Sequence, residues 1–176
     1  MTFTFGALKS LFRATFICAA IALPTLLDYE ETEFYSYDFI EREVKVAQND
    51  LYWLALNIYH EARNQHFFGK LAVGIVTLNR VHSERYENTI EKVVKEHKQF
   101  SWYHTKKKHA PKDMDAWKEC IHIAKMILTK SPEIDIMTHN LKSVTHYHAT
   151  YVRPKWSKSY QRVIQIGDHI FYRQKK

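Results

Sequence analysis

The stretch Leu51–Val81, LYWLALNIYHEARNQHFFGKLAVGIVTLNRV, decides how this chain of 176 residues folds. In its first half, apolar residues recur at the spacing of one helical stripe, which predicts a helix from Asp50 to about Arg63 with Asn49 or Asp50 as its N-cap. The second half, Gly69–Val81, is apolar on nearly every side, as is typical of a helix in the middle of a fold. A buried strand is the alternative for this run, but the run is long for a strand. Because the junction between the halves is short, we expect two helices that pack against each other.

One carboxylate, Glu61, stands near the end of the first predicted helix. At about 100° per residue it lies about 80° from the centre of the apolar stripe, on the shoulder between core and solvent. Partial desolvation raises the pKa of such a carboxyl, so that it can hold a proton near neutral pH, as a general acid must. The alternative interpretation is a surface carboxylate that pairs with Arg63 or Lys70. The second helix favours the acid, because it places Glu61 beside a buried element.

Two separated motifs carry a resemblance to a known family. They are ALNIYHEARNQ…GKLAVGIVTLNRV…TIEKVVKEHKQFSW and, near the C-terminus, THYHATYVRPKW…IGDHIFY. Over residues 51–172 the chain resembles the SleB-type cell wall hydrolases. The resemblance implies an α+β, lysozyme-like fold that cuts the glycan strand of peptidoglycan, with Glu61 as the catalytic acid.

The first 27 residues differ in character from the rest of the chain. Lys9 and Arg13 precede Ala14–Leu27, a run of 14 residues without a charge. A basic flank followed by a short apolar run is typical of an export signal, and the run is short for a membrane-spanning helix, which needs about 20 residues. We therefore predict an export signal or signal anchor over residues 1–27, with residues 8–27 contacting the membrane. An ordinary buried helix is the alternative.

Residues 28–43 hold seven acidic residues against one arginine and are predicted to be an acidic linker. The chain carries +7 in total, of which residues 1–27 contribute +2 and residues 28–43 contribute −6, so residues 44–176 carry +11. Such a body is attracted to polyanions. Nucleic acid and the anionic bacterial wall are both candidates, and an export signal favours the wall. We therefore predict a catalytic domain over residues 44–176 with peptidoglycan, and not nucleic acid, as its partner.

Two further helices are predicted between the central pair and the C-terminal third. Asn88-Thr89 with Glu91 forms a capping-box-like start for a short helix through about Glu96. Asp113 to about Thr129 is amphipathic, and Cys120 belongs to its apolar side. Cys120 is therefore predicted to be a packed thiol and not a nucleophile.

The last third is predicted to form strands. Residues 143–151 alternate, and residues 161–166 and 169–173 flank a Gly167-Asp168 hairpin signal. A small antiparallel sheet beside a helical body leaves a cleft between them. Residues 99–103 add an amide, a hydroxyl and aromatic rings in one loop, which suits sugar binding, although aromatic side chains are as often core. The predicted substrate-binding residues are Gln99, Phe100, Ser101, Trp102, Thr145, His146 and Tyr147.

Eleven histidines raise the question of zinc. His60 and His66 lack the i, i+4 spacing that places two imidazoles on one helical face. His146 and His148 could chelate from one strand face, but His169 is only a guess for a third ligand. No Ser-His-Asp or Cys-His signature is present. We predict no metal and no other cofactor, with a zinc metallohydrolase as the weaker alternative.

The predicted activity is cleavage between N-acetylmuramic acid and N-acetylglucosamine, by a lytic transglycosylase or a muramidase. Glu61 would protonate the glycosidic oxygen. Because no second carboxylate is evident, Glu61 would then accept the proton of the muramic C6 hydroxyl and leave a 1,6-anhydro ring. The alternative from a different class is a secreted basic module that binds the wall or nucleic acid without cutting.

Overall fold

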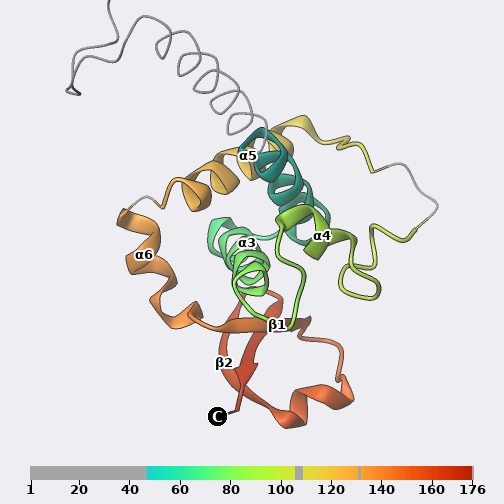
Figure 1. Cartoon of the computed structure of the whole chain (residues 1–176), viewed down its shortest axis with the longest axis vertical. Helices are drawn as coiled ribbons and strands as arrows, with labels where there is room; N and C mark the ends of the chain where they lie inside the picture. The colour runs from blue at the N-terminus through green and yellow to red at the C-terminus, as the bar shows by residue number, and fades with distance from the viewer. Residues whose placement is uncertain (1–46, 106–108, 131, 176) are drawn as a thin grey trace, which may run out of the picture. The chain divides into compact units, whose positions relative to one another are not determined.

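The structure, a computed structural model, describes residues 47–105, 109–130 and 132–175, which belong to the unit Glu43–Lys176 (Figure 1). The predicted export signal (residues 1–27) and acidic linker (residues 28–43) lie outside the described residues. Within the described ranges, no helix has the length and apolar character needed to cross a membrane.

Two helices form the centre of the helical body. The first, residues 47–62, is called the Glu61 helix below, and the second is α3 (Phe67–Val81). Gly74 of α3 lets its neighbours approach closely, because a Cβ at this position would lie 2.5 Å from Cδ1 of Ile127 and 3.0 Å from Cδ1 of Ile58. The two-helix prediction for residues 51–81 is confirmed.

The predicted N-cap of the Glu61 helix is wrong. Asn49 and Asp50 lie inside the helix, which is already formed at residue 47. The Asn49 side chain instead donates a hydrogen bond to Glu91 Oε2 at 3.1 Å. An Asn-Asp pair caps a helix only where the residues before it are not helical, and here residues 47 and 48 are helical.

Helices α4 (Ile90–Lys95) and α5 (Met114–Leu128) pack against α3 and complete the main core. Thr89 caps α4 by accepting a hydrogen bond from the backbone N–H of Lys92, and Asp113 caps α5 by accepting one from Ala116. The Thr89 cap confirms the helix start predicted at Asn88-Thr89. Helix α5 begins directly after Asp113, close to its predicted start, and its cap was not predicted. Cys120 is fully buried in this core, and burial raises the pKa of its thiol to about 11, so it is the packed thiol expected.

The C-terminal part carries a three-stranded antiparallel sheet in the order β1-β3-β2. Helix α6 (Pro132–Thr138) and the 3-10 turn η1 (His139–Leu141), neither of which the sequence predicted, lead into β1 (Val144–Ala149). The 3-10 turn η2 (Lys155–Ser159) precedes β2 (Tyr160–Ile166), and the hairpin turn leads to β3 (His169–Gln174).

The sheet lies against one side of α3 (Figure 1). Val144 and Phe171 are fully buried and pack with Ala72 and Val76 of α3 in a second, smaller core. The α+β division that the sequence predicted, a helical body beside a small antiparallel sheet, is therefore confirmed. Glu61 stands where these two parts meet.

Candidate active site

Glu61 occupies the last turn of its helix and faces the sheet. The Tyr147 hydroxyl on β1 donates a hydrogen bond of 2.8 Å to Glu61 Oε2, across 86 residues of sequence. The Glu61 residue as a whole is partly exposed.

The surroundings of Glu61 act on the pKa of its carboxyl in opposite directions. Burial raises the pKa of Glu61, whereas the hydrogen bond from Tyr147 and the positive charge of Arg80 lower it by less, so the net direction is upward. Burial, and then the charge of Glu61, raises the pKa of Tyr147 well above its ordinary value. Tyr147 therefore keeps its proton and acts as a donor toward Glu61.

The alternative interpretation of Glu61 as a surface ion-pair partner is wrong. Lys70 is bound to Glu119 instead, and the exposed Arg63 guanidinium lies 5.5 Å from the ring centroid of Tyr59. Among the described residues, no lysine or arginine nitrogen lies within 4.0 Å of the Glu61 carboxylate.

Arg80, near the end of α3, is a site residue that the sequence analysis missed. It is 5% exposed, and its Nε donates a hydrogen bond of 2.8 Å to the backbone oxygen of Thr145 on β1. Its guanidinium lies 4.9 Å from the ring centroid of Phe100 and 5.4 Å from that of Tyr86. The available signal was one arginine in an otherwise apolar helix, since a buried charge needs a partner or a function.

Gln65 fixes the sheet to the end of the Glu61 helix. Its Nε2 donates to Asp168 Oδ2 at 3.0 Å, and its Oε1 accepts the backbone N–H of Asp168 at 3.1 Å. Asp168 lies in the β2–β3 turn beside Gly167, whose φ of 53° is the left-handed conformation that glycine favours. This contact fixes the β2–β3 turn, and β3 pairs with β1, the strand that carries Tyr147. The hairpin turn was predicted from Gly167-Asp168, but its contact with Gln65 was not.

The predicted sugar-binding loop, residues 99–102, is divided between core and surface. Phe100 is 1% exposed and belongs to the main core, which favours the core alternative for this ring. Trp102 is 9% exposed, stacks on His60 with 4.3 Å between ring centroids, and donates its Nε1–H to Asn57 Oδ1 at 2.9 Å. Gln99 is partly exposed and Ser101 is exposed.

The predicted site residues of strand β1 point in two directions. Tyr147 points to Glu61, whereas His146 packs against the ring of Tyr160, with 4.2 Å between centroids. The Thr145 hydroxyl lies 3.0 Å from His146 Nδ1. Burial, followed by the charges of Arg80 and other cations nearby, lowers the pKa of His146 to about 4. Among the residues that the structure describes, no group of three or more histidine, cysteine, aspartate or glutamate side chains is placed to hold a metal.

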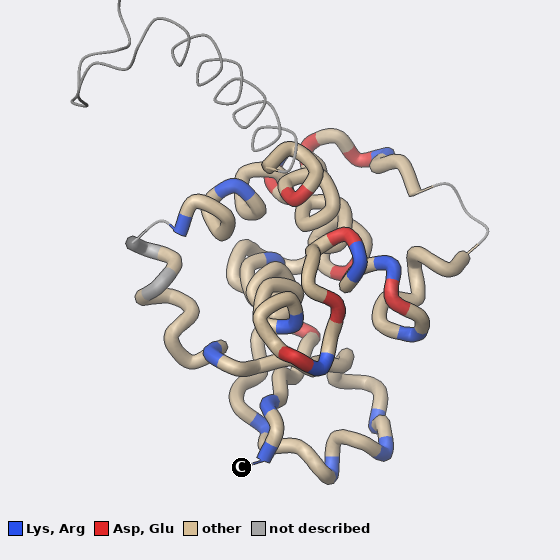
Figure 2. Tube along the Cα trace, in the orientation of Figure 1, with Lys and Arg blue, Asp and Glu red and all other residues tan. Residues whose placement is uncertain are grey.

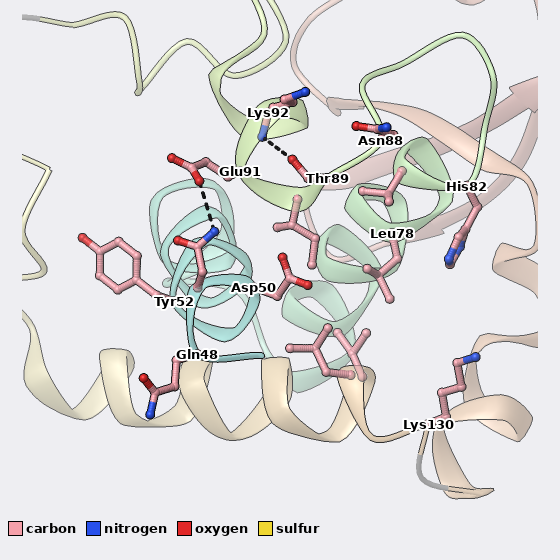
Figure 3. A pocket seen from close by; sticks show the side chains of 15 residues that line it. Gln48, Asp50, Tyr52, Leu78, His82, Asn88, Thr89, Glu91, Lys92 and Lys130 are labelled. Carbon is pink, nitrogen blue, oxygen red and sulfur yellow. Dashed lines mark hydrogen bonds between the residues drawn. The ribbon is translucent and has the colours of Figure 1, made fainter. Parts of the chain in front are cut away.

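A cavity of about 1010 Å³ lies away from Glu61 (Figure 3). The first turns of the Glu61 helix, the ends of α3 and α5 and the start of α4 line it, including Asp50, Leu78 and Glu91. Glu61 follows Asp50 by eleven residues, which is about 16 Å along a helix. This cavity is therefore separate from the candidate site.

Residues 64–172, more than half of the chain, match the family described as Cell Wall Hydrolase, and the chain belongs to this family. Glu61 lies three residues before the matched segment. A spore cortex-lytic enzyme of Oceanobacillus iheyensis is 26% identical over 125 residues, covering 71% of this chain and 42% of that protein. One from Bacillus cereus is 38% identical over 55 residues, covering 31% and 21%. The chain thus spans less than half the length of these curated relatives.

Two solved structures resemble the fold. The catalytic domain of the Bacillus cereus SleB protein superposes with a TM-score of 0.51 at 26% identity, covering 72% of this chain and 91% of that one. The catalytic domain of a germination-specific lytic transglycosylase, SleB from Bacillus anthracis, gives a TM-score of 0.51 at 28% identity and covers 72% and 95%. The SleB-type resemblance and the α+β, lysozyme-like fold inferred from the sequence are confirmed.

Proposed function

We propose that this protein cleaves the glycan strand of peptidoglycan between N-acetylmuramic acid and N-acetylglucosamine, as a lytic transglycosylase with Glu61 as its acid and base. One observation carries the proposal. Glu61 is a carboxyl with a raised pKa, hydrogen-bonded by Tyr147 at the junction of helices and sheet, in a member of the Cell Wall Hydrolase family. The similarity to a structure titled as a lytic transglycosylase supports the same activity.

The reaction divides into two proton transfers on one carboxyl. Protonated Glu61 gives its proton to the glycosidic oxygen while the bond from that oxygen to the muramic C1 breaks and oxocarbenium character develops. The C6 hydroxyl of the same muramic residue then bonds to C1, and its proton passes to the Glu61 carboxylate. No water is consumed, the acid is regenerated, and the product ends in a 1,6-anhydro ring.

The proposed route uses one carboxylate, whereas ordinary retaining and inverting glycosidases use two carboxyl groups. The positive charge of Arg80 acts on Glu61 and lowers its pKa. An internal nucleophile, the C6 hydroxyl, removes the need for a second carboxylate to activate water.

Tyr147 and Arg80 act on this cycle as positioning residues. Burial favours the protonated acid that starts the reaction, whereas the Tyr147 hydroxyl and the Arg80 charge stabilise the carboxylate left after proton donation. The two effects oppose each other, and the net direction of the pKa is upward. A group that acts first as acid and then as base uses both protonation states.

Product analysis tests the proposed activity. The protein is incubated with purified peptidoglycan, and the released muropeptides are measured by mass spectrometry. We expect chains that end in 1,6-anhydromuramic acid, and we expect them to form after exhaustive chelation, since the route uses no metal.

Reducing ends that are one water heavier would contradict the transglycosylase and keep Glu61 as an acid. Loss of activity on chelation that zinc alone restores would favour a metallohydrolase instead, and binding without cleavage would favour the non-catalytic module.

For localisation, we propose that residues 1–27 export or tether the chain, so that residues 44–176 act in the cell wall or outside the cell. The Cell Wall Hydrolase family supports the site of action, and the basic flank with its short apolar run supports the route. A reporter active only outside the cytoplasm, fused after residue 43, should give signal, and charged substitutions of Ile21 and Leu23 should remove it. An unchanged signal in that variant would contradict the proposal.

A further inference from the structure

A second cavity, of about 860 Å³, lies where the end of α3 meets one edge of the sheet. Its walls come from the end of α3 and the segment that follows it, from the start of β1, and from β2 and the end of β3. Arg85, Arg173 and Lys175 line it, and none of its lining residues is acidic. Tyr86, Tyr160 and His146 supply aromatic surface beside these cations. The cavity is thus a cationic one with polar and aromatic walls.

These cations are not neutralised by the protein around them. Within the described residues, no carboxylate lies within 4.0 Å of the charged nitrogens of Arg85, Arg173 or Lys175. The Arg173 Nε is buried and has no hydrogen-bond partner there. A buried guanidinium nitrogen without an acceptor is costly, so this N–H is available to an acceptor from outside the protein, either a ligand or water.

The sequence concentrates positive charge in the same part of the molecule. Residues 142–175 contain seven lysines and arginines against one acidic residue, Asp168, and that carboxylate is held by Gln65 in the β2–β3 turn. Figure 2 shows Lys and Arg distributed along the strands and the η2 segment. The surface around the cavity therefore attracts anions.

The cavity lies close to the candidate active site. Thr145, one of its lining residues, precedes Tyr147 by two positions on β1, which is about 7 Å of strand. Arg80 connects the two places, because it donates to the Thr145 backbone oxygen and its charge acts on Glu61. A branched substrate with one part at Glu61 can therefore place a side branch in the cavity.

We propose that this cavity binds the carboxylates of the peptide stem on the muramic residue whose glycosidic bond lies at Glu61. The inference rests on the proposed function and specifies its substrate as peptide-bearing glycan. The stem leaves the sugar ring through the lactyl group on C3, so it begins within a few bonds of the scissile linkage. Arginine guanidinium groups bind carboxylates through paired hydrogen bonds, and a third cation adds charge.

Binding measured without turnover tests the proposal. The ligands are soluble glycan fragments that carry peptide stems and the same fragments after an amidase has removed the stems, titrated by calorimetry into the Glu61→Gln protein. We expect the stems to strengthen binding at least tenfold. The exposed pair Arg85→Gln/Lys175→Gln should lose this gain and leave binding of the stem-free fragment unchanged. Lys118→Gln/Lys125→Gln on α5 removes the same charge elsewhere and should behave like its parent.

Several outcomes would overturn the proposal. Equal binding of both fragments by the parent protein would do so, as would an equal loss for both fragments in Arg85→Gln/Lys175→Gln. A glycerol-phosphate polymer that displaces the stem-bearing fragment and binds more tightly would assign the cavity to a phosphate polymer. Cleavage by the wild-type protein is measured separately. Absence of cleavage would contradict the proposed function, whereas binding by the Glu61→Gln protein tests the cavity independently.

Discussion

Replacing Glu61 by glutamine is expected to lower the rate of glycan cleavage by roughly 10²–10⁴-fold or more, because general acid catalysis commonly contributes that much. Glutamine keeps the shape of the side chain and can still accept the Tyr147 hydrogen bond, but it has no proton to transfer to the glycosidic oxygen. Because the proposed route uses one carboxylate for both proton transfers, we expect the loss at the upper end of this range. Initial rates of muropeptide release measure it.

Glu91→Gln is the matched control, because it makes the same chemical change on α4. Hydrogen bonds from Lys95 and Asn49 lower the pKa of Glu91, so this carboxylate is ionised and is no acid near neutral pH. Its variant should stay within a few-fold of wild type. A Glu61→Gln protein that cleaves the glycan at full rate would remove Glu61 from the mechanism, and with it the proposed proton transfers.

The same variant should be more stable than wild type at neutral pH. The folded-state pKa of Glu61 is raised, mainly by burial, above its unfolded value. The stability linked to this group is therefore fully present below the unfolded pKa and is lost as pH rises through the folded pKa. Glutamine carries no charge to desolvate, so thermal midpoints should favour Glu61→Gln at neutral pH and converge with wild type in acid. If Glu61 were a surface ion-pair partner, the Glu61→Gln protein would instead be less stable than wild type at neutral pH, by at most about 1 kcal/mol.

Local signals in the sequence predicted most elements of the fold. The cap at Thr89 and the turn at Gly167 depend on hydrogen bonds and dihedral angles within a few residues, and each stands where it was predicted. Helix geometry places Glu61 on the shoulder of the apolar stripe, but its selection as the acid also needed the buried second helix and the family motif. Helix α6 gave no such signal, since a helix of seven residues is too short to show a clear period.

The partners of Glu61 could not be predicted, because they depend on how the sheet docks on the helices. Tyr147 was predicted to be a site residue from the strand pattern and the family motif, but its bond to Glu61 depends on the packing of β1 against the helices, which the sequence does not show. Arg80 was read as part of an apolar helix, and its role follows from the contact with Thr145 on β1. Burial of Trp102 is equally a tertiary property, since an aromatic residue in a loop can face either way.

Asn57 joins this loop to the two central helices, one turn before Glu61. It is fully buried, its Nδ2 donates to Thr77 Oγ1 at 3.0 Å, and its Oδ1 accepts the Trp102 indole N–H at 2.9 Å. Both helices and the loop therefore share one buried polar group. Buried polar groups of this kind hold neighbouring elements in one arrangement only while every partner is satisfied.

Asn57→Leu is expected to destabilise the fold by about 2–4 kcal/mol, because a leucine of similar size removes both hydrogen bonds and leaves the Trp102 N–H buried without an acceptor, a cost of about 1–3 kcal/mol by itself. Urea unfolding measures it. The double variant Asn57→Leu/Trp102→Phe removes the orphaned donor as well, so it should be more stable than the sum of the two single changes by about 1 kcal/mol. If the free-energy changes of the two single variants add up to that of the double variant, Asn57 and Trp102 are not coupled. Trp102→Phe alone removes the indole donor from the buried Asn57 Oδ1, so it should lower stability whatever else the ring contacts. An unchanged KM in this variant would indicate a ring that only supports His60, whereas a raised KM would indicate a ring that contacts sugar.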